Sequence, residues 1–460
     1  MFIEQIYTDC LAQAAYYIES EGEAAIIDPI RETEPYLEYA SERNSSIKYI
    51  FETHFHADFV SGHIDLSEKT GAQIVFGPLA NTKYQVHNAV DEEIFELGKI
   101  KIKAMHTPGH TPESTCYLIY DENGVEHAVF TGDTLFVGDV GRPDLLDGKM
   151  TKEELAGMMY ESLNSKIKVL SDDVIVYPAH GPGSSCGKSL GDEKSSTIGE
   201  QKRSNYALQE MTKDKFIKLV TDGLLPPPQY FFKDAMINKN GSDNVEEVLE
   251  SNINALSLDE FNNAVSDGAA VIDSRFNGVF EKGYIPGSIN IGLDGMYAIW
   301  VGTLINPDTQ LVIVAEEGME VESIQRLTRV GYDNVLGYLH NGISSWADSG
   351  EKLDSIESIS PQKFAAQDNK TTDVLDVRKV SEYDAGHLEG AINIPLANLQ
   401  GALNQLDKDT TYYIHCLTGY RSMSAISILK ANGYSKLVNI SEGMEGLLET
   451  DIPVLSNELA

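Results

Sequence analysis

The sequence is poor in cysteine and in basic residues. Only four cysteines occur in 460 residues, and no two of them have the C-x-x-C spacing. A disulfide framework and a zinc ribbon are therefore excluded as the organising features. The 35 basic residues stand against 71 acidic ones, giving a formal net charge of −36. Because such a surface repels phosphate backbones and anionic lipids, we expect no nucleic-acid partner and no membrane partner.

Long hydrophobic runs are missing as well. No apolar stretch approaches the ~20 residues that a membrane-spanning helix needs. The first residues, MFIEQ, have neither the basic region nor the apolar region of a signal peptide. We therefore expect a cytoplasmic protein with reduced thiols, which we also expect to form a homo-oligomer. At roughly 150 residues per domain, the length predicts about three domains.

An internal repeat fills the last part of the chain. The segment VIDSRFNGVFEKGYIPGSINI at 271–291 aligns with VLDVRKVSEYDAGHLEGAINI at 374–394. In each copy a second β-branched run, Leu311–Val314 or Tyr412–His415, precedes a helical pattern. Alternating strands and helices predict an α/β domain with a largely parallel sheet. We place the domain boundaries so that the three domains comprise residues 1–250, 251–354 and 355–460.

The first 180 residues have a different pattern and contain eight of the eleven histidines. Short strands are predicted at Ala15–Ile18, Ala24–Ile27, Lys48–Phe51, Gln73–Phe76, Lys99–Met105, Ala128–Phe130 and Val174–Tyr177, with helices at Pro35–Ser41 and Lys152–Lys166. Four of these strands end in loops that carry side chains able to bind a metal, namely THFHAD at 53–58, TPGHT at 107–111, FTGDT at 130–134 and YPAHG at 177–181. A satisfied core histidine explains any one of these loops alone. Four together favour a metal site.

These loops resemble the metallo-β-lactamase superfamily, whose pattern is His-x-His-x-Asp-His followed by His, Asp and His. The resemblance implies an αββα sandwich. One position departs from the pattern, because Phe59 stands where the superfamily has a histidine of its second metal site. That departure argues against a dinuclear zinc centre. His54, His110 and Asp133 remain as a two-histidine, one-carboxylate set, which suits one mononuclear Fe(II) per chain with open positions. A zinc ion with the same ligands stays possible, and Asp58 is then the candidate base.

Other residues near this set are candidates for supporting roles. His56, Asp58 and His180 are expected to orient the ligands or to contact substrate. Arg142 is either a solvated loop residue or a clamp for a substrate carboxylate or phosphate. Cys186, in the loop GSSCG, is either a structural thiol or a carrier of sulfur.

The second repeat carries a cysteine at a strand end. The loop at 416–421, CLTGYR, comprises Cys416, Leu417, Thr418, Gly419, Tyr420 and Arg421, and a helical pattern follows it. Backbone N–H groups of such a loop stabilise a thiolate or hold a persulfide. Together with the motifs DVR at 376–378 and GHLEGAIN at 386–393, the loop looks like the catalytic loop of a rhodanese domain. Its six-residue length is the one associated with sulfur transfer.

The first repeat keeps the scaffold but not the chemistry. Its corresponding loop, AEEGME at 315–320, places Ala315 at the cysteine position and Glu320 at the arginine position. We therefore expect this copy to be catalytically inert, with a structural or docking role.

The whole chain resembles persulfide dioxygenase–rhodanese fusions that contain an inactive rhodanese copy in the middle. The resemblance implies that a low-molecular-weight persulfide is oxidised by O₂ to sulfite, and that Cys416 exchanges sulfane sulfur between persulfide, sulfite and thiosulfate. The purpose would be sulfide detoxification. The thiol carrier and the direction of the transfer stay open. The competing interpretation is a zinc thioester hydrolase of the glyoxalase II type fused to rhodanese modules.

Overall fold

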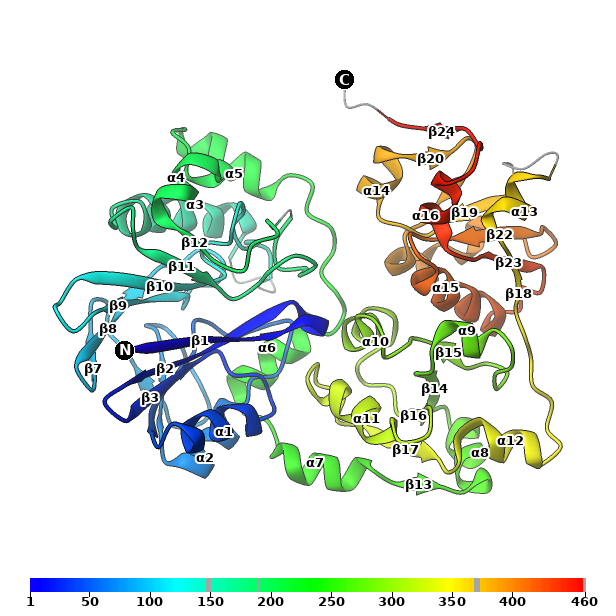
Figure 1. Cartoon of the computed structure of the whole chain (residues 1–460), viewed down its shortest axis with the longest axis horizontal. Helices are drawn as coiled ribbons and strands as arrows, with labels where there is room; N and C mark the ends of the chain where they lie inside the picture. Colours follow the sequence, from blue (N-terminus) through cyan, green and yellow to red (C-terminus); the bar gives the residue numbers. More distant parts are fainter. Residues whose placement is uncertain (146–149, 189, 368–372, 458–460) are drawn as a thin grey trace. The chain divides into compact units, whose positions relative to one another are not determined.

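The computed structural model describes residues 1–145, 150–188, 190–367 and 373–457. The chain forms two compact units (Figure 1). The first comprises Met1–Val248 with Thr328–Gly331, and the second comprises Leu249–Leu327 with Tyr332–Ala460. Both sequence repeats belong to the second unit, and the finer division near residues 250 and 355 stays a prediction. None of the helices in the described ranges is long and apolar enough to cross a bilayer.

The first unit is built on two mixed six-stranded sheets. In spatial order, the first sheet consists of β1 (Phe2–Thr8), β2 (Gln13–Ser20), β3 (Glu23–Ile27), β4 (Ser46–Phe51), β5 (Gln73–Phe76) and β6 (His87–Asn88). The second consists of β12 (Ser196–Thr197), β11 (Ile175–Pro178), β10 (Glu126–Gly132), β9 (Thr115–Tyr120), β8 (Ile100–His106) and β7 (Ile94–Leu97). Strands β3 to β6 run parallel, as do β10 and β11, so their carboxyl ends meet at one edge of each sheet.

Helices α1 (Glu34–Glu42), α2 (His63–Thr70), α3 (Lys152–Ser162), α4 (Ile198–Ser204) and α5 (Lys213–Thr221) flank the two sheets. Two further helices, α6 (Phe231–Asn240) and α7 (Val245–Asn252), follow along the chain. Figure 1 shows α1 and α2 beside the first sheet and α3 to α5 beside the second. One buried cluster joins side chains of both sheets, among them Tyr16, Phe51 and Tyr117. Another joins the second sheet to α3 and α5 through Leu118, Met159 and Phe216. The four layers of the predicted αββα sandwich are therefore present.

The second unit contains two five-stranded parallel sheets with the same strand order. The first has the order β13 (Ala255–Leu256), β17 (Val335–Leu339), β16 (Leu311–Val314), β14 (Ala270–Asp273) and β15 (Ile289–Asn290). The second has the order β18 (Glu357–Ile359), β23 (Leu437–Ile440), β22 (Tyr412–His415), β19 (Val374–Asp376) and β21 (Ile392–Asn393). A small ladder pairs β20 (His387–Leu388) with β24 (Val454–Leu455). The predicted repetition is thus a repetition of topology.

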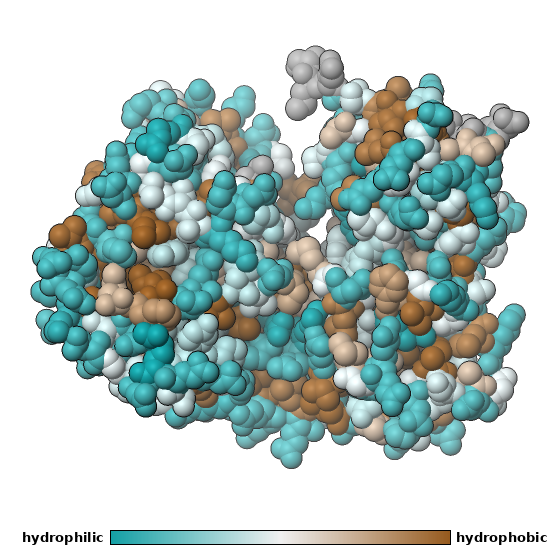
Figure 2. All heavy atoms as spheres, in the orientation of Figure 1, coloured by the Kyte–Doolittle hydropathy of each residue, from teal (hydrophilic) through white to brown (hydrophobic). Residues whose placement is uncertain are grey.

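Four α-helices of the first repeat have counterparts in the second, whereas α10 corresponds to the 3₁₀ turns Leu396–Asn398 and Gln400–Gln405. The first has α8 (Leu258–Ser266), α9 (Asn277–Phe280), α10 (Tyr297–Leu304), α11 (Glu320–Thr328) and α12 (Gly342–Asp348). The second has α13 (Pro361–Ala365), α14 (Val380–Ala385), α15 (Tyr420–Ala431) and α16 (Gly443–Leu448). In both copies an arginine two residues after the first central strand pairs with the aspartate that ends it. The pairs are Arg275 with Asp273 and Arg378 with Asp376. On the face seen in Figure 2, hydrophilic residues predominate, in keeping with the acidic composition.

Candidate metal centre and sulfur-transfer loop

Three strand ends of the first unit bring His54, His110 and Asp133 together. They follow β4, β8 and β10 respectively, and all three are buried. Asp133 Oδ2 lies 3.4 Å from His110 Nε2 and 4.0 Å from His54 Nε2. These separations suit ligand atoms that share one metal ion better than direct hydrogen bonds. The set has two imidazoles and one carboxylate.

The Nε2 atoms of the histidines are free to face a ligand because their Nδ1 atoms are already engaged. His110 Nδ1 contacts the Arg142 carbonyl at 2.7 Å, and His54 Nδ1 contacts Thr53 Oγ1 at 3.0 Å. Among the described residues, His54 Nε2 and both carboxylate oxygens of Asp133 are buried without a hydrogen-bond partner. Buried polar atoms without partners are costly unless a ligand satisfies them. The residues present therefore fit a metal ion, and each engaged Nδ1 fixes the orientation that binding needs.

The charge state of His54 also fits metal binding. Burial, together with the neighbouring His56, His110 and His180, holds the pKa of His54 well below its usual range. The imidazole is therefore neutral, which is the form that binds a metal. Its neighbour Thr53 donates its hydroxyl to Asp28 Oδ2 at 2.8 Å. The hydroxyl of Thr53 therefore links the His54 ring to a carboxylate.

His56 turns away from this cluster toward two buried carboxylates. Its Nε2 lies 3.1 Å from Asp28 Oδ1 and 3.4 Å from Glu52 Oε2. Burial opposes the charged imidazole, but the two carboxylates outweigh it and raise the pKa of His56 well above its usual range. Burial opposes ionisation of Glu52 also, yet His63 and His56 lower its pKa to about 2. Burial keeps the pKa of Asp28 raised in spite of His56, so we take Glu52 as the ionised partner.

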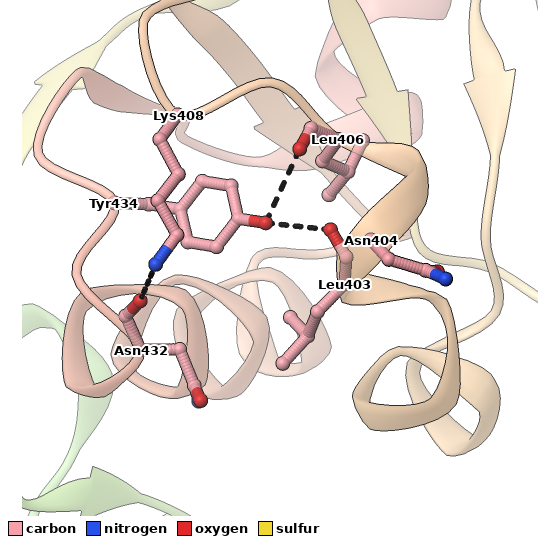
Figure 3. A pocket seen from close by; sticks show the side chains of 6 residues that line it. All are labelled: Leu403, Asn404, Leu406, Lys408, Asn432 and Tyr434. Atoms are coloured by element: carbon pink, nitrogen blue, oxygen red, sulfur yellow. Dashed lines mark hydrogen bonds between the residues drawn. The ribbon is translucent and has the colours of Figure 1, made fainter.

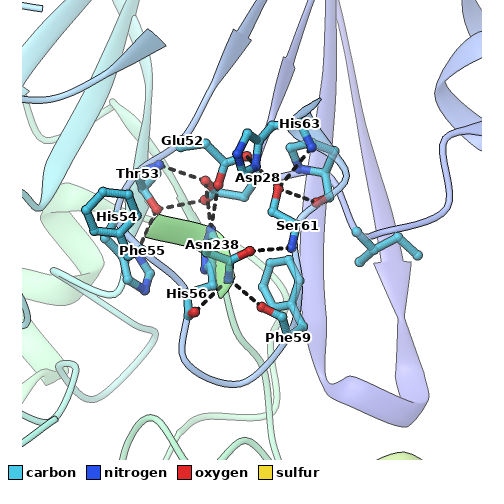
Figure 4. Close-up of polar contacts among 12 residues, drawn as sticks. Asp28, Glu52, Thr53, His54, Phe55, His56, Phe59, Ser61, His63 and Asn238 are labelled. Carbon is cyan, nitrogen blue, oxygen red and sulfur yellow. Dashed lines mark hydrogen bonds and ion pairs between the residues drawn. The ribbon is translucent and has the colours of Figure 1, made fainter. Parts of the chain in front are cut away.

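The loop that carries these side chains is held by α6. Asn238 donates its amide to the carbonyls of His56 and Phe59, both at 2.7 Å. Its side-chain oxygen accepts the Ser61 N–H at 2.8 Å. Figure 4 shows Asn238 facing these groups. Sequence reasoning missed this residue, because nothing local distinguishes an asparagine in a connecting helix. Asp28 and Glu52 were missed as well, although Asp28 directly follows β3 and Glu52 directly follows β4.

A second buried group lies beside the first. His180 Nε2 is 3.4 Å from Asp58 Oδ2 and 3.4 Å from Asp133 Oδ1. The ligand atoms of Asp58, His180 and Cys186 all lie within 4.8 Å of one another. Burial, with Asp58 and Asp133 nearby, raises the pKa of the Cys186 thiol well above its usual range. The thiol of the metal-free protein is therefore protonated.

The guanidinium of Arg142 makes its hydrogen bonds to other residues of the first unit. Its guanidinium forms a bidentate pair with Asp144 at 2.7 and 2.8 Å. It also donates to the carbonyls of Ser185 and Leu225. Two backbone contacts link Arg142 to the site: its carbonyl contacts His110 Nδ1, and its N–H donates to the Cys186 carbonyl at 2.9 Å. The clamp for a substrate anion stays a prediction.

The sulfur-transfer loop of the second repeat leaves β22 at Cys416 and enters α15 at Tyr420. Cys416 is buried, and its Sγ accepts the Gly419 N–H at 3.2 Å. Gly419 has φ +109°, a left-handed conformation that glycine adopts without a Cβ penalty. Tyr420 donates its hydroxyl to the Gly292 carbonyl at 2.7 Å, which ties the loop to the first repeat within the same unit.

Arg421 forms a bidentate ion pair that the sequence reasoning missed. Both of its terminal nitrogens lie 2.7 Å from the oxygens of Glu382 in α14. Burial disfavours the carboxylate, but Arg421 lowers the pKa of Glu382 below its usual range. The aligned position of the first repeat is Val279, and Ala315 follows β16 where Cys416 follows β22. That repeat therefore lacks the thiol, the cation and its counter-ion.

A shallow pocket elsewhere in the second repeat offers no comparable chemistry. It has a volume of about 260 Å³ and is lined by Leu403, Asn404, Leu406, Lys408, Asn432 and Tyr434. Figure 3 shows the Tyr434 hydroxyl directed at the carbonyls of Leu403 and Leu406. These residues supply neither a thiol nor a metal ligand.

Known families match both units. The metallo-beta-lactamase superfamily matches residues 8–180, and the rhodanese-like domain matches residues 257–349 and 360–450. The persulfide dioxygenase ETHE1, mitochondrial, of Homo sapiens is 30% identical over 209 residues, which are 45% of this chain and 74% of that protein. The chain belongs to the metallo-β-lactamase superfamily. It carries two rhodanese-like domains after the superfamily domain, which confirms the predicted order and fold class.

Other members of the superfamily are as similar to this chain. The probable hydroxyacylglutathione hydrolase glo2 of Schizosaccharomyces pombe is 34% identical over 160 residues, covering 34% of this chain and 58% of the relative. The chain thus spans less than two thirds of that relative's length. A crystal structure of a metallo-beta-lactamase from Staphylococcus aureus subsp. aureus COL is 33% identical, with a TM-score of 0.66. It covers 74% of this chain and 98% of that one. The names of these three relatives therefore indicate three different activities.

Proposed function

We propose that the chain is a non-haem iron persulfide dioxygenase coupled to a thiosulfate sulfurtransferase. The observation that carries the proposal is the pairing of a buried two-histidine, one-carboxylate set with an intact Cys416 loop on one chain. The 30% identity to the human persulfide dioxygenase supports it. His54, His110 and Asp133 would hold one Fe(II), which supplies the reaction with O₂ that side chains cannot perform.

The first reaction would consume a low-molecular-weight persulfide. One persulfide, one O₂ and one water give one thiol and one sulfite with its two protons, so that the terminal sulfur is oxidised and O₂ is reduced. The chain's own contribution is orientation and exclusion of bulk water. His54 and His110 are held through Nδ1, and the cluster is buried. Asp58 and His180 lie next to the cluster, where they can hold or move a proton.

The second reaction would take place at Cys416. A persulfide on its Sγ transfers the outer sulfur to sulfite, giving thiosulfate and restoring the thiolate. The Gly419 N–H donates to this sulfur, and Arg421 offers a cation that Glu382 holds in place. The reverse direction uses the same groups. We place this sulfide detoxification in the cytoplasm, supported by the four cysteines that have no C-x-x-C spacing.

The test measures iron content of anaerobically purified protein and O₂ uptake with glutathione persulfide. We expect about one iron per chain at the set formed by His54, His110 and Asp133, and persulfide-dependent O₂ consumption. His54→Ala should lose both and keep sulfur transfer from thiosulfate. Zinc alone, with no O₂ uptake after Fe(II) reconstitution across several persulfides, would overturn the proposal.

A zinc thioester hydrolase is the second candidate, favoured by the 34% identity to the hydroxyacylglutathione hydrolase. It predicts hydrolysis of a glutathione thioester by the zinc-loaded protein without O₂. The same preparation distinguishes the two candidates, because thioester turnover and O₂ uptake are read separately.

A further inference from the structure

A four-residue segment of the first repeat belongs to the first unit. This segment, Thr328–Gly331, begins with the last residue of α11 and ends just before Tyr332. The chain on either side of it, up to Leu327 and from Tyr332 onward, belongs to the second unit. The catalytically inert repeat therefore contributes a piece of chain to the unit that carries the metal ligands.

The backbone of this segment bonds to the metal-binding loop that follows β4, residues 52–62. The Val60 N–H donates to the Arg329 carbonyl at 2.7 Å. Val60 is fully buried, so this N–H would be costly to leave without a partner. Asn238 bonds the carbonyl of the preceding residue and the N–H of the following one. Arg329 therefore holds the N–H that lies between the two groups held by Asn238.

The side chain of Arg329 anchors the residue whose carbonyl receives Val60. Its Nε lies 2.6 Å from Glu32 Oε1, and its Nη1 donates to Cys10 Sγ at 3.2 Å. Both partners belong to the first unit, and Glu32 is only 5% exposed. Because a hydrogen bond between two ionised groups is stronger than a neutral one, the guanidinium can fix the backbone at this point.

The loop after β3 anchors the segment a second time. Arg31 is buried and donates from Nη1 to the Thr328 carbonyl at 2.7 Å. The same loop carries Glu32, and it begins at Asp28, whose carboxylate accepts an N–H of the metal-binding loop at 2.7 Å. The segment, the loop after β3 and the metal-binding loop are thus joined by hydrogen bonds within the first unit.

The second repeat has no counterpart of Arg329. Gly331 aligns with Gly433, an offset of 102, and the same offset places Ala431 at the position of Arg329. Ala431 is exposed and carries no charged group that could hold a neighbouring loop. The copy that lacks the sulfur-transfer thiol is therefore the copy that carries the anchoring arginine.

We propose that Arg329 is a positioning residue for the metal centre, and that holding the metal-binding loop is the role of the inert repeat. The guanidinium bonds Glu32, and the carbonyl of the same residue receives the Val60 N–H. The loop fixed in this way keeps the His54 imidazole directed at the other two ligands. The inference rests on the proposed metal centre, whereas its first test uses the metal-free chain.

Amide hydrogen exchange of the full-length metal-free chain reports on the Val60 hydrogen bond. Arg329→Ala should speed exchange in the peptide that contains Val60 by about fivefold to tenfold, because the accepting carbonyl loses its anchor. Arg326→Ala is the control, at an arginine of the same helix. It bonds Glu322 and the Leu293 carbonyl, which both belong to the second unit. This variant should leave the exchange of that peptide unchanged.

Metal affinity is the second readout, with Zn²⁺ as the probe because two histidines and a carboxylate accept it. Arg329→Ala should weaken Zn²⁺ binding about fivefold in competition with a chelator, as expected for one lost buried hydrogen bond. Arg329→Lys keeps a cation for Glu32 and should recover most of the affinity. Arg326→Ala should bind Zn²⁺ as the wild type does.

Three results would overturn the proposal. One is unchanged exchange of the Val60 peptide in Arg329→Ala. Another is an equal loss of Zn²⁺ affinity in Arg326→Ala and Arg329→Ala, which would mean that general destabilisation of α11 is responsible. The third is an Arg329→Lys form that binds Zn²⁺ no better than Arg329→Ala. The iron proposal fails separately, through absent O₂ uptake in the Fe(II) form of the wild type.

Discussion

Phe59 packs against the imidazole of His56 with the two rings tilted, their centroids 4.3 Å apart and the interplanar angle 32°. The residue that replaces a metal-binding histidine of the superfamily thus packs against another histidine of the same motif. The imidazole of His56 also faces the carboxylates of Asp28 and Glu52. His54, two residues earlier, instead faces His110 and Asp133.

Replacing His56 should therefore affect stability more than metal content. His56→Ala removes one of the two histidines that face the buried Glu52, and it also removes the partner of the buried Asp28, which together cost about 3–5 kcal/mol of unfolding free energy. Urea unfolding would measure this loss. Metal analysis of the folded protein should still find the metal ion held by His54, His110 and Asp133, whereas His54→Ala should lose it. Equal loss of metal in both variants would contradict the assignment.

The hydrogen bonds by which α6 holds the metal-binding loop can be tested by replacing Asn238. Asn238→Ala removes three hydrogen bonds to the backbone of His56, Phe59 and Ser61, for a loss of about 2–4 kcal/mol. We expect weaker metal binding, measured by competition with a chelator. Met236→Ala, at a residue of the same helix that is 52% exposed, is the matched control and should change neither quantity. Unchanged metal affinity in Asn238→Ala would show that the loop keeps its geometry without the clamp.

The two proposed reactions should separate by mutation. Cys416→Ser removes the thiol that carries sulfane sulfur, so thiosulfate sulfurtransfer should fall to background. Persulfide-dependent O₂ uptake should stay largely intact, because the metal set belongs to the other unit. Both rates are measured on one preparation. A collapse of O₂ uptake in this variant would mean that the two sites are not independent.

The Glu382–Arg421 pair should make the sulfur-transfer domain sensitive to acid. The folded-state pKa of Glu382 is depressed, so the pair contributes stability above the ordinary carboxyl pKa of about 4.3 and loses it as the pH falls through the lower folded value. The difference in unfolding free energy between the wild type and Glu382→Gln should be on the order of 1 kcal/mol near pH 7. It should shrink below about pH 4. A difference that grows on acidification would contradict the sign of this pKa shift.

The ends of several strands could be predicted from the sequence because short hydrophobic runs mark them locally. Runs such as Leu311–Val314 and Tyr412–His415 appear in the structure with the predicted bounds. The strand β9 was missed, since TCYLIY is a buried run without alternation and periodicity does not distinguish it from a buried helix. The predicted helix Lys152–Lys166 is α-helical to Ser162 and continues as a wider turn over Leu163–Ile167.

The sequence by itself determined the two kinds of domain, their order and the residue types at the strand ends. It did so because hydrophobic periodicity and glycine-containing loops are properties of neighbouring residues, and because a repeat can be found by comparing the sequence with itself. Only the tertiary structure decided where His56 points and which groups surround Cys186. These depend on approaches between loops far apart in the chain, such as the 128 residues from Asp58 to Cys186. Only packing brings them together, because ligand directions follow from buried contacts that no local pattern encodes.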